Sequence, residues 1–133
     1  MAIDVNGLSP LLQVYDMARA LGFYRDVLGF ELAASSPPDD EGHFDWCMLE
    51  LGGAVLMLNT AYERHDRPAA EPERREDRGV TLYLGCTSVD EVYAHMRDKG
   101  WNVKPPTSAP YGMRQLYVRD PDGFELCFQH PVA

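Results

Sequence analysis

The side chains of this 133-residue chain that most often attack substrates or bind metals are its three cysteines and four histidines. Cys47, Cys86 and Cys127 are an odd number without CxxC spacing, and each falls in a strand-like stretch. We therefore expect buried thiols rather than a disulfide framework. Cys127 acting as a nucleophile needs an activating base, and the sequence places none at a defined spacing, so we expect an inert thiol.

The histidines form no metal-binding or catalytic pattern. His43 and His65 fall in or beside predicted loops, His95 lies within a predicted helix, and His130 follows the last predicted strand. We expect solvated or capping histidines at these positions. No stretch of the sequence resembles a phosphate-cradling glycine loop.

The charge and composition of the chain exclude some classes of partner. A net charge of −9 argues against nucleic acid, whose phosphates need a basic surface. The same acidity is compatible with a cationic small ligand, although it more often serves solubility. No apolar run approaches the roughly 18 residues that span a membrane, and no signal peptide opens the chain. We therefore expect a cytoplasmic protein without a membrane partner, and the length fits one domain.

The stretch from Gln115 to Gln129 predicts two strands joined by a tight turn. In the turn 120–123, Asp-Pro-Asp-Gly, the proline pre-sets φ, the aspartates can bond their own backbone and the glycine can take positive φ. Alternation gives this hairpin two faces. The apolar face holds Leu116, Val118, Leu126 and Phe128, and the mixed face holds Gln115, Tyr117, Glu125, Cys127 and Gln129.

The first half of the chain predicts a βαβββ order. A strand over 8–15 leads to a helix over 17–28, and a strand over 30–34 leads to a hairpin of 44–51 and 54–59. The hairpin turns at Gly52-Gly53.

The second half repeats this order at an offset of about seventy residues. It predicts a strand over 80–86, a helix from the Ser88 and Glu91 capping box to Lys99, a strand over 101–105 and the closing hairpin. We therefore predict one domain, 1–133, made of a first module (1–62), a charged and aperiodic linker (63–78) and a second module (79–133).

Two motifs of this repeat resemble a known family. They are Phe23-Tyr24 followed by Leu28-Gly29-Phe30 in the first helix, and the Asp-Pro-Asp-Gly turn near the end. The chain resembles the vicinal oxygen chelate (VOC) superfamily, which contains glyoxalase I, extradiol dioxygenases, fosfomycin-resistance enzymes and bleomycin-resistance proteins. The resemblance implies an α+β fold of two βαβββ modules that form curved mixed sheets. Helices then cover the convex sides, and the concave sides form a ligand groove, usually in a dimer.

In such a fold, alternation assigns each strand residue to one side of its sheet. The helix-covered side is predicted to hold Leu12, Val14, Cys47, Leu49, Leu56, Leu58, Leu82, Leu84, Leu116, Val118, Leu126 and Phe128. The ligand-binding side is predicted to hold Gln13, Trp46, Met48, Met57, Asn59, Tyr83, Gln115, Tyr117, Glu125, Cys127 and Gln129.

The enzymes of this superfamily hold a divalent metal with His, Gln or Glu side chains on four strands. Carried over by motif, these positions fall at Ser9, Met57, Thr81 and Cys127. Such a set does not make an oxygen and imidazole site for Mn, Fe, Ni or Zn. We therefore expect no metal and no cofactor.

The sequence thus favours a metal-free homodimer that binds an organic small molecule, similar to bleomycin-resistance proteins. Trp46, Tyr83 and Tyr117 are expected to supply stacking area, and no catalytic residue is assigned. Two alternatives stay open. One is a glyoxalase- or dioxygenase-like enzyme, a lyase or an oxidoreductase, with a non-standard site, and the other is a non-catalytic interaction module.

Overall fold

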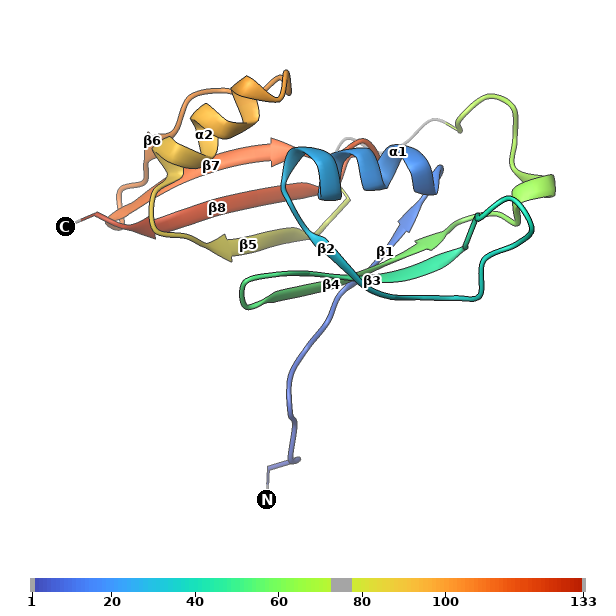
Figure 1. Cartoon of the computed structure of the whole chain (residues 1–133). Coiled ribbons are helices and arrows are strands. Elements are labelled where there is room, and N and C mark those ends of the chain that lie inside the picture. Colours follow the sequence, from blue (N-terminus) through green and yellow to red (C-terminus); the bar gives the residue numbers. More distant parts are fainter. Residues whose placement is uncertain (1, 73–77, 133) are drawn as a thin grey trace. The chain divides into compact units, whose positions relative to one another are not determined.

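The computed structural model describes residues 2–72 and 78–132, in which two four-stranded mixed sheets form (Figure 1). Sheet A comes from the first half of the chain and has the strand order β1-β4-β3-β2. β1 runs parallel to β4, and the other neighbours are antiparallel. Its strands are β1 (Leu11–Val14), β2 (Glu31–Ser35), β3 (Trp46–Leu51) and β4 (Ala54–Thr60).

Sheet B comes from the second half of the chain and has the same topology, β5-β8-β7-β6. β5 runs parallel to β8, and the other neighbours are again antiparallel. The strands are β5 (Thr81–Gly85), β6 (Thr107–Ser108), β7 (Met113–Arg119) and β8 (Glu125–Pro131). The repeated topology confirms the α+β fold with mixed sheets that the sequence predicts.

The first helical segment has the predicted extent but changes its hydrogen-bond pattern midway. It begins as the α-helix α1 (Met17–Leu21) and continues as the π-helical η1 (Gly22–Val27). The backbone N–H of Leu28 donates to Phe23 O, five residues back, at 3.0 Å. Gly29, with φ +92°, ends the segment in the left-handed region that glycine tolerates.

The second helix, α2 (Val89–Asp98), begins as its capping sequence predicts. Ser88 Oγ accepts a hydrogen bond from the backbone N–H of Glu91 at 3.2 Å. A single 3₁₀ turn, η2 (Arg64–Asp66), contains His65. Among the helices described in residues 2–72 and 78–132, none is long and apolar enough to cross a bilayer.

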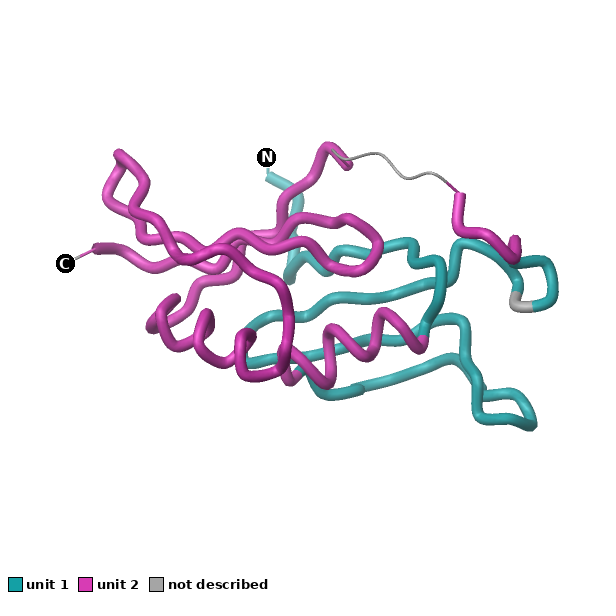
Figure 2. Tube along the Cα trace, turned by 90° about the horizontal axis from the view of Figure 1, so that it is seen from above, with its two compact units in different colours: residues 1–17, 30–67 teal, residues 18–29, 68–133 magenta. Residues whose placement is uncertain are grey.

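Packing divides the chain differently from the sequence repeat (Figure 2). One compact unit comprises residues 1–17 and 30–67 and contains sheet A. The other comprises residues 18–29 and 68–133 and contains sheet B. Most of the first helical segment therefore packs in the unit of sheet B, although it belongs to the first βαβββ repeat. Residues 73–77 of the predicted linker lie outside the described residues.

The apolar faces predicted by alternation form the core. Leu82 and Leu84, on the edge strand β5, are half-buried. The other predicted members are buried: Leu12, Val14, Cys47, Leu49, Leu56, Leu58, Leu116, Val118, Leu126 and Phe128. Alternation therefore assigns the core side of both sheets correctly.

The predicted strand over 101–105 is wrong. These residues have no strand conformation, and the edge strand of sheet B is the two-residue β6. Pro105 and Pro106 lack the N–H groups that a strand ladder needs. Trp101 instead packs its ring against Phe23, with ring centroids 4.6 Å apart.

Three smaller expectations are also corrected. The first strand begins at Leu11 rather than at residue 8, because residues 2–10 have no regular structure. His130 lies inside β8 and not after it. Cys86 is only partly buried, because it follows the last residue of the edge strand β5.

Candidate functional site

The solvent-facing side of sheet B carries the mixed residues that the sequence predicts for ligand binding. Paired residues of neighbouring strands lie opposite one another and form rows across the sheet. One row consists of Tyr117, Cys127 and Tyr83, and the next contains Gln115 and Gln129. Tyr83 is 55% exposed and Tyr117 is 39% exposed, whereas Cys127, in the strand between theirs, is fully buried. The accessible surface of this row is therefore made by the two phenol rings.

Hydrogen bonds join five side chains here into a tyrosine–glutamine cluster: Tyr83, Tyr111, Gln115, Tyr117 and Gln129. Gln115 Nε2 donates to Tyr111 OH at 2.9 Å and to Gln129 Oε1 at 3.0 Å. The Tyr117 hydroxyl donates to Gln115 Oε1 at 3.4 Å and lies 3.4 Å from the Tyr83 hydroxyl. Gln115 is buried, so its amide links the exposed rings from below. These bonds hold the rings in place before any ligand arrives.

The cluster is electrically neutral. The hydrogen bond between the hydroxyls of Tyr117 and Tyr83, reinforced by burial, raises the pKa of Tyr117 above its ordinary value, so the phenol stays protonated. Burial raises the pKa of the Cys127 thiol, and a hydrogen bond with Tyr117 offsets this only in part. A buried, protonated thiol is a poor nucleophile. The cluster therefore offers stacking area and neutral hydrogen-bonding groups.

Glu125 lies one row further along the same face and is already engaged within the protein. Its Oε1 accepts a hydrogen bond from Thr81 Oγ1 at 2.7 Å. Its Oε2 forms an ion pair with Arg119, at 3.7 Å from Arg119 NH2. Arg114, which is also in β7, instead binds Asp90 through two hydrogen bonds of 2.8 and 3.0 Å.

The corresponding side of sheet A carries the other predicted contacts. One cross-strand row consists of Gln13, Asn59 and Trp46, and the next contains Met57 and Met48. Gln13 is exposed, and the other four are half-buried. The structure thus brings the predicted site residues together as two sets, one on each sheet, with every member on the expected face.

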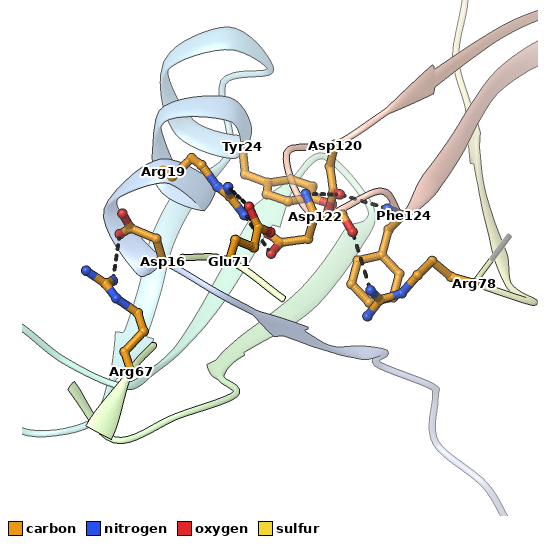
Figure 3. Close-up of polar contacts among 9 residues, drawn as sticks. All are labelled: Asp16, Arg19, Tyr24, Arg67, Glu71, Arg78, Asp120, Asp122 and Phe124. Atoms are coloured by element: carbon orange, nitrogen blue, oxygen red, sulfur yellow. Dashed lines mark hydrogen bonds and ion pairs between the residues drawn. The ribbon is translucent and has the colours of Figure 1, made fainter. Parts of the chain in front are cut away.

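The two family motifs meet within the unit of sheet B (Figure 3). Tyr24 of η1 is fully buried, and its hydroxyl donates to Asp120 Oδ2 at 2.7 Å. Asp120 Oδ1 accepts from the backbone N–H groups of Asp122 and Phe124, both at 2.9 Å. The backbone N–H of Gly123 donates to Asp120 O at 3.0 Å, which closes the predicted turn. The motifs therefore form a structural joint between the helix and the hairpin.

A second set of contacts ties α1 to the same turn (Figure 3). Arg19 donates to Glu71 through hydrogen bonds of 2.6 and 2.9 Å and to Asp122 Oδ1 at 3.0 Å. The hydrogen bond to Glu71 raises the pKa of the Arg19 guanidinium further above its already high value. Arg78 lies over the Phe124 ring at 4.2 Å. These interactions fix the end of the hairpin that carries the cluster.

Sequence patterns did not identify Tyr111, which is 67% exposed and belongs to the tyrosine–glutamine cluster. It lies in a turn before β7, where alternation along a strand gives no orientation. Gly112, with φ +82°, redirects the chain between Tyr111 and the strand. The signal that the sequence offered was an aromatic residue next to a glycine.

The four positions that hold metal in the family's enzymes do not fit a metal site here. Ser9 precedes β1 and is exposed, and Met57 offers a thioether in β4. The Thr81 hydroxyl donates to Glu125, and the Cys127 thiol is kept protonated by burial. An oxygen and imidazole site for Mn, Fe, Ni or Zn needs carboxylate or imidazole donors, which these four side chains do not supply. Among the residues that the structure describes, no three His, Cys, Asp or Glu side chains gather as a metal site.

The comparisons with known proteins agree with this fold. The chain belongs to the Glyoxalase/Bleomycin resistance protein/Dioxygenase superfamily, whose family model matches residues 8–128. It is similar to a lactoylglutathione lyase of Haemophilus influenzae, with 30% identity in an alignment that is 133 positions long and covers 91% of this chain and 89% of the relative. The predicted resemblance is therefore confirmed.

Two solved structures share the fold at lower sequence identity. A glyoxalase/bleomycin resistance protein/dioxygenase from Nocardioides has a TM-score of 0.72 at 22% identity, and the match covers 98% of this chain and 87% of that one. A bleomycin-binding protein complexed with bleomycin has a TM-score of 0.69 at 18% identity, covering 95% of this chain and 98% of that one. At these identities the likeness establishes the fold.

Proposed function

We propose that the protein binds an organic small molecule on the solvent-facing side of its sheets, without a metal ion, in the cytoplasm. The observation that carries the proposal is the tyrosine–glutamine cluster of sheet B. Its phenol rings are exposed, yet hydrogen bonds through the buried Gln115 hold them in position. Pre-positioned aromatic rings are costly to leave in water and well suited to stack on a planar ligand.

The polar members of the cluster give the ligand its orientation. The hydroxyls of Tyr83 and Tyr111 and the amide of Gln129 present donors and acceptors beside the rings. In sheet A we propose that Gln13, Trp46, Met48, Met57 and Asn59 also contact ligand, since they share one accessible face. Cys127 contributes as buried support and not as a reactive thiol.

Two of the solved structures that share this fold are binding proteins, which supports the proposal. One structure with this fold is a bleomycin-binding protein in complex with bleomycin. Another is an antibiotic-binding protein from a Streptomyces species, with a TM-score of 0.67. The side chains at positions 9, 57, 81 and 127 agree with a protein that has kept the fold without the metal.

The second candidate function is a lyase reaction. The 30% identity to a lactoylglutathione lyase favours it. The donor set of this chain argues against a metal-dependent version, because a thioether and a buried thiol do not replace carboxylate or imidazole ligands. A lyase would therefore need a site different from the one that the motif positions define.

A ligand screen by thermal unfolding, run with the purified full chain before and after metal removal by EDTA, tests the proposal. The panel includes bleomycin, other aromatic antibiotics, and the methylglyoxal–glutathione adduct for the lyase alternative. We expect an aromatic compound to raise the unfolding temperature equally in both samples, because a ligand bound to the native state stabilises it by mass action. Stabilisation that disappears with EDTA, or turnover of the glutathione adduct, would contradict the proposal.

A further inference from the structure

The hydrogen bonds of the tyrosine–glutamine cluster run in one direction. Gln115 Nε2 uses both of its hydrogens, one toward Tyr111 OH at 2.9 Å and one toward Gln129 Oε1 at 3.0 Å. The Tyr117 hydroxyl gives its single hydrogen to Gln115 Oε1 at 3.4 Å. The contact of 3.4 Å between the hydroxyls of Tyr83 and Tyr117 therefore has Tyr83 as its donor. Hydrogens thus point from the tyrosine pair toward Gln115, and from Gln115 toward the last two members of the cluster.

The buried amide of Gln115 keeps this direction fixed. Its oxygen and both of its Nε2 hydrogens are used within the cluster, and the side chain is only 4% exposed. If this amide alone turned over, its oxygen would face Gln129 Oε1, and two buried acceptors would meet without a hydrogen between them. Such an arrangement costs more than the loss of one hydrogen bond. The orientation of Gln115 therefore sets the orientation of Gln129.

Two donor groups remain at the end of this network. Because Gln129 Oε1 accepts from Gln115, Gln129 Nε2 keeps two hydrogens, and no side chain or carbonyl within residues 2–72 and 78–132 accepts them. The Tyr111 hydroxyl accepts from the same Gln115 nitrogen and keeps its own hydrogen, which also lacks an acceptor in the described part of the chain. Tyr111 is 67% exposed and Gln129 is half-buried, so a ligand can reach both. This end of the cluster therefore offers neighbouring donors to a ligand.

The charges near these donors favour an uncharged acceptor. Amide and phenol groups are neutral donors, and the cluster contains no lysine or arginine that would pair with an anion. Glu125 adds a carboxylate to the same face, and the chain has a net charge of −9. Both repel a carboxylate, sulfonate or phosphate on the ligand. A carbonyl oxygen is the acceptor that fits neutral donors in such surroundings.

We propose that sheet B takes an uncharged, planar aromatic ligand that carries a carbonyl group. The carbonyl oxygen accepts hydrogen bonds from Gln129 Nε2 and Tyr111 OH, and the rings lie against Tyr83 and Tyr117. The two rows of the cluster are about 7 Å apart along the strands, which two or three fused rings can span. This inference rests on the proposed function and deepens it by naming the ligand group that is recognised. It makes Gln129 and Tyr111 specificity-determining residues.

The test uses three planar tricyclic probes of matching shape with the full chain. Fluorenone presents a carbonyl acceptor, carbazole presents an N–H donor at the same position, and fluorene presents only a methylene group. Binding is followed in amide proton–nitrogen correlation spectra, where the side-chain amide signals of Gln129 report contact with the donor end. Gln129→Glu keeps an oxygen for Gln115 but removes the donor. The matched control, Asn102→Asp, adds the same charge at an exposed position outside the cluster.

We expect fluorenone to bind about tenfold more tightly than fluorene and to shift the Gln129 side-chain amide signals. Carbazole is expected to bind no more tightly than fluorene. The preference for fluorenone over fluorene should disappear in Gln129→Glu and persist in Asn102→Asp. Tyr111→Phe, which leaves the charge unchanged, should reduce the preference. Urea unfolding of each variant checks that the native fold is retained.

Four results would overturn the inference. They are tighter binding of carbazole than of fluorenone, equal affinity for the three probes, no binding of fluorenone, and a preference for fluorenone that survives in Gln129→Glu. Equal binding of the three probes that is weakened by Tyr83→Ala overturns the carbonyl assignment and leaves the proposed binding function intact. Failure of the proposed function is distinguished by a thermal screen in which no aromatic compound stabilises the protein.

Discussion

Replacement of Tyr24 by Phe tests whether the helix and the Asp-Pro-Asp-Gly turn are joined as the structure indicates. The substitution keeps the buried ring and removes one hydroxyl, which donates to Asp120 Oδ2 at 2.7 Å. Loss of a buried hydrogen bond to a charged group costs about 1.5–3 kcal/mol. We therefore expect the free energy of unfolding at pH 7 to fall by about 2 kcal/mol, measured by urea titration.

The pH dependence of this loss distinguishes the hydrogen bond from packing. Burial raises the pKa of Asp120 in the folded state, while the bond from Tyr24 lowers it in part. A raised folded pKa means that the contribution of Asp120 to stability is largest below its unfolded pKa of about 3.9 and falls as pH rises through the folded pKa. Tyr24→Phe raises that folded pKa further. We therefore expect its cost to be smaller near pH 4 than at pH 7.

The matched control is Tyr93→Phe. The Tyr93 hydroxyl accepts a hydrogen bond from Arg97 NH1 at 2.8 Å on the exposed surface of α2. We expect its removal to change the unfolding free energy by no more than about 0.5 kcal/mol. A loss for Tyr24→Phe as small as that of the control, or one that is independent of pH, would refute the proposed joint.

Three further predictions concern the turn, the thiols and the assembly. Gly123 has φ +88°, so we expect Gly123→Ala to lower the free energy of unfolding by about 1–2 kcal/mol. An unchanged free energy of unfolding, measured by urea titration, would contradict the turn geometry. Native protein should show one thiol that reacts with a disulfide reagent, Cys86, and unfolded protein three; fast native reaction of Cys47 or Cys127 would oppose their burial. Sedimentation at micromolar concentration should give a homodimer, because the half-buried Trp46 and its apolar neighbours leave part of sheet A open, and a monomer would count against it.

Local patterns were sufficient to predict most of the fold. Alternation identified the core faces of β3, β4, β7 and β8, because the side-chain period of a strand is set by its backbone. The turn at 120–123 and the cap at Ser88 followed from side chains that bond their own backbone nearby. Each of these features is determined by a few residues that are adjacent in the sequence, so the sequence alone is enough to predict it.

Features that depend on distant residues were missed. The sequence assigned residues 18–29 to the first repeat, but Tyr24 and Arg19 find their partners at Asp120 and Asp122, about a hundred residues away. The edge strand of sheet B was expected over 101–105, but it forms at β6, where no proline interrupts the hydrogen-bond ladder. Such pairings are decided by tertiary packing and not by local preference.

The candidate site was predicted in part, for the same reason. Alternation correctly placed Tyr83, Tyr117 and Cys127 on one face, but it does not reveal that Cys127 is buried there. Burial on an outer face depends on the size of the side chains in the neighbouring strands. Tyr111 was missed because its position depends on the turn at Gly112. That this face binds a ligand stays a prediction.

The most direct test of ligand binding compares affinity and stability in Tyr83→Ala, using the compound that gives the largest shift in the thermal screen. Tyr93→Ala serves as the control on α2. Because Tyr83 is more than half exposed, we expect its loss to lower the unfolding free energy by less than about 1 kcal/mol and the binding free energy by about 1–3 kcal/mol, in metal-free buffer. Unchanged affinity in Tyr83→Ala, or affinity that appears only when Zn²⁺ or Ni²⁺ is added, would contradict the account.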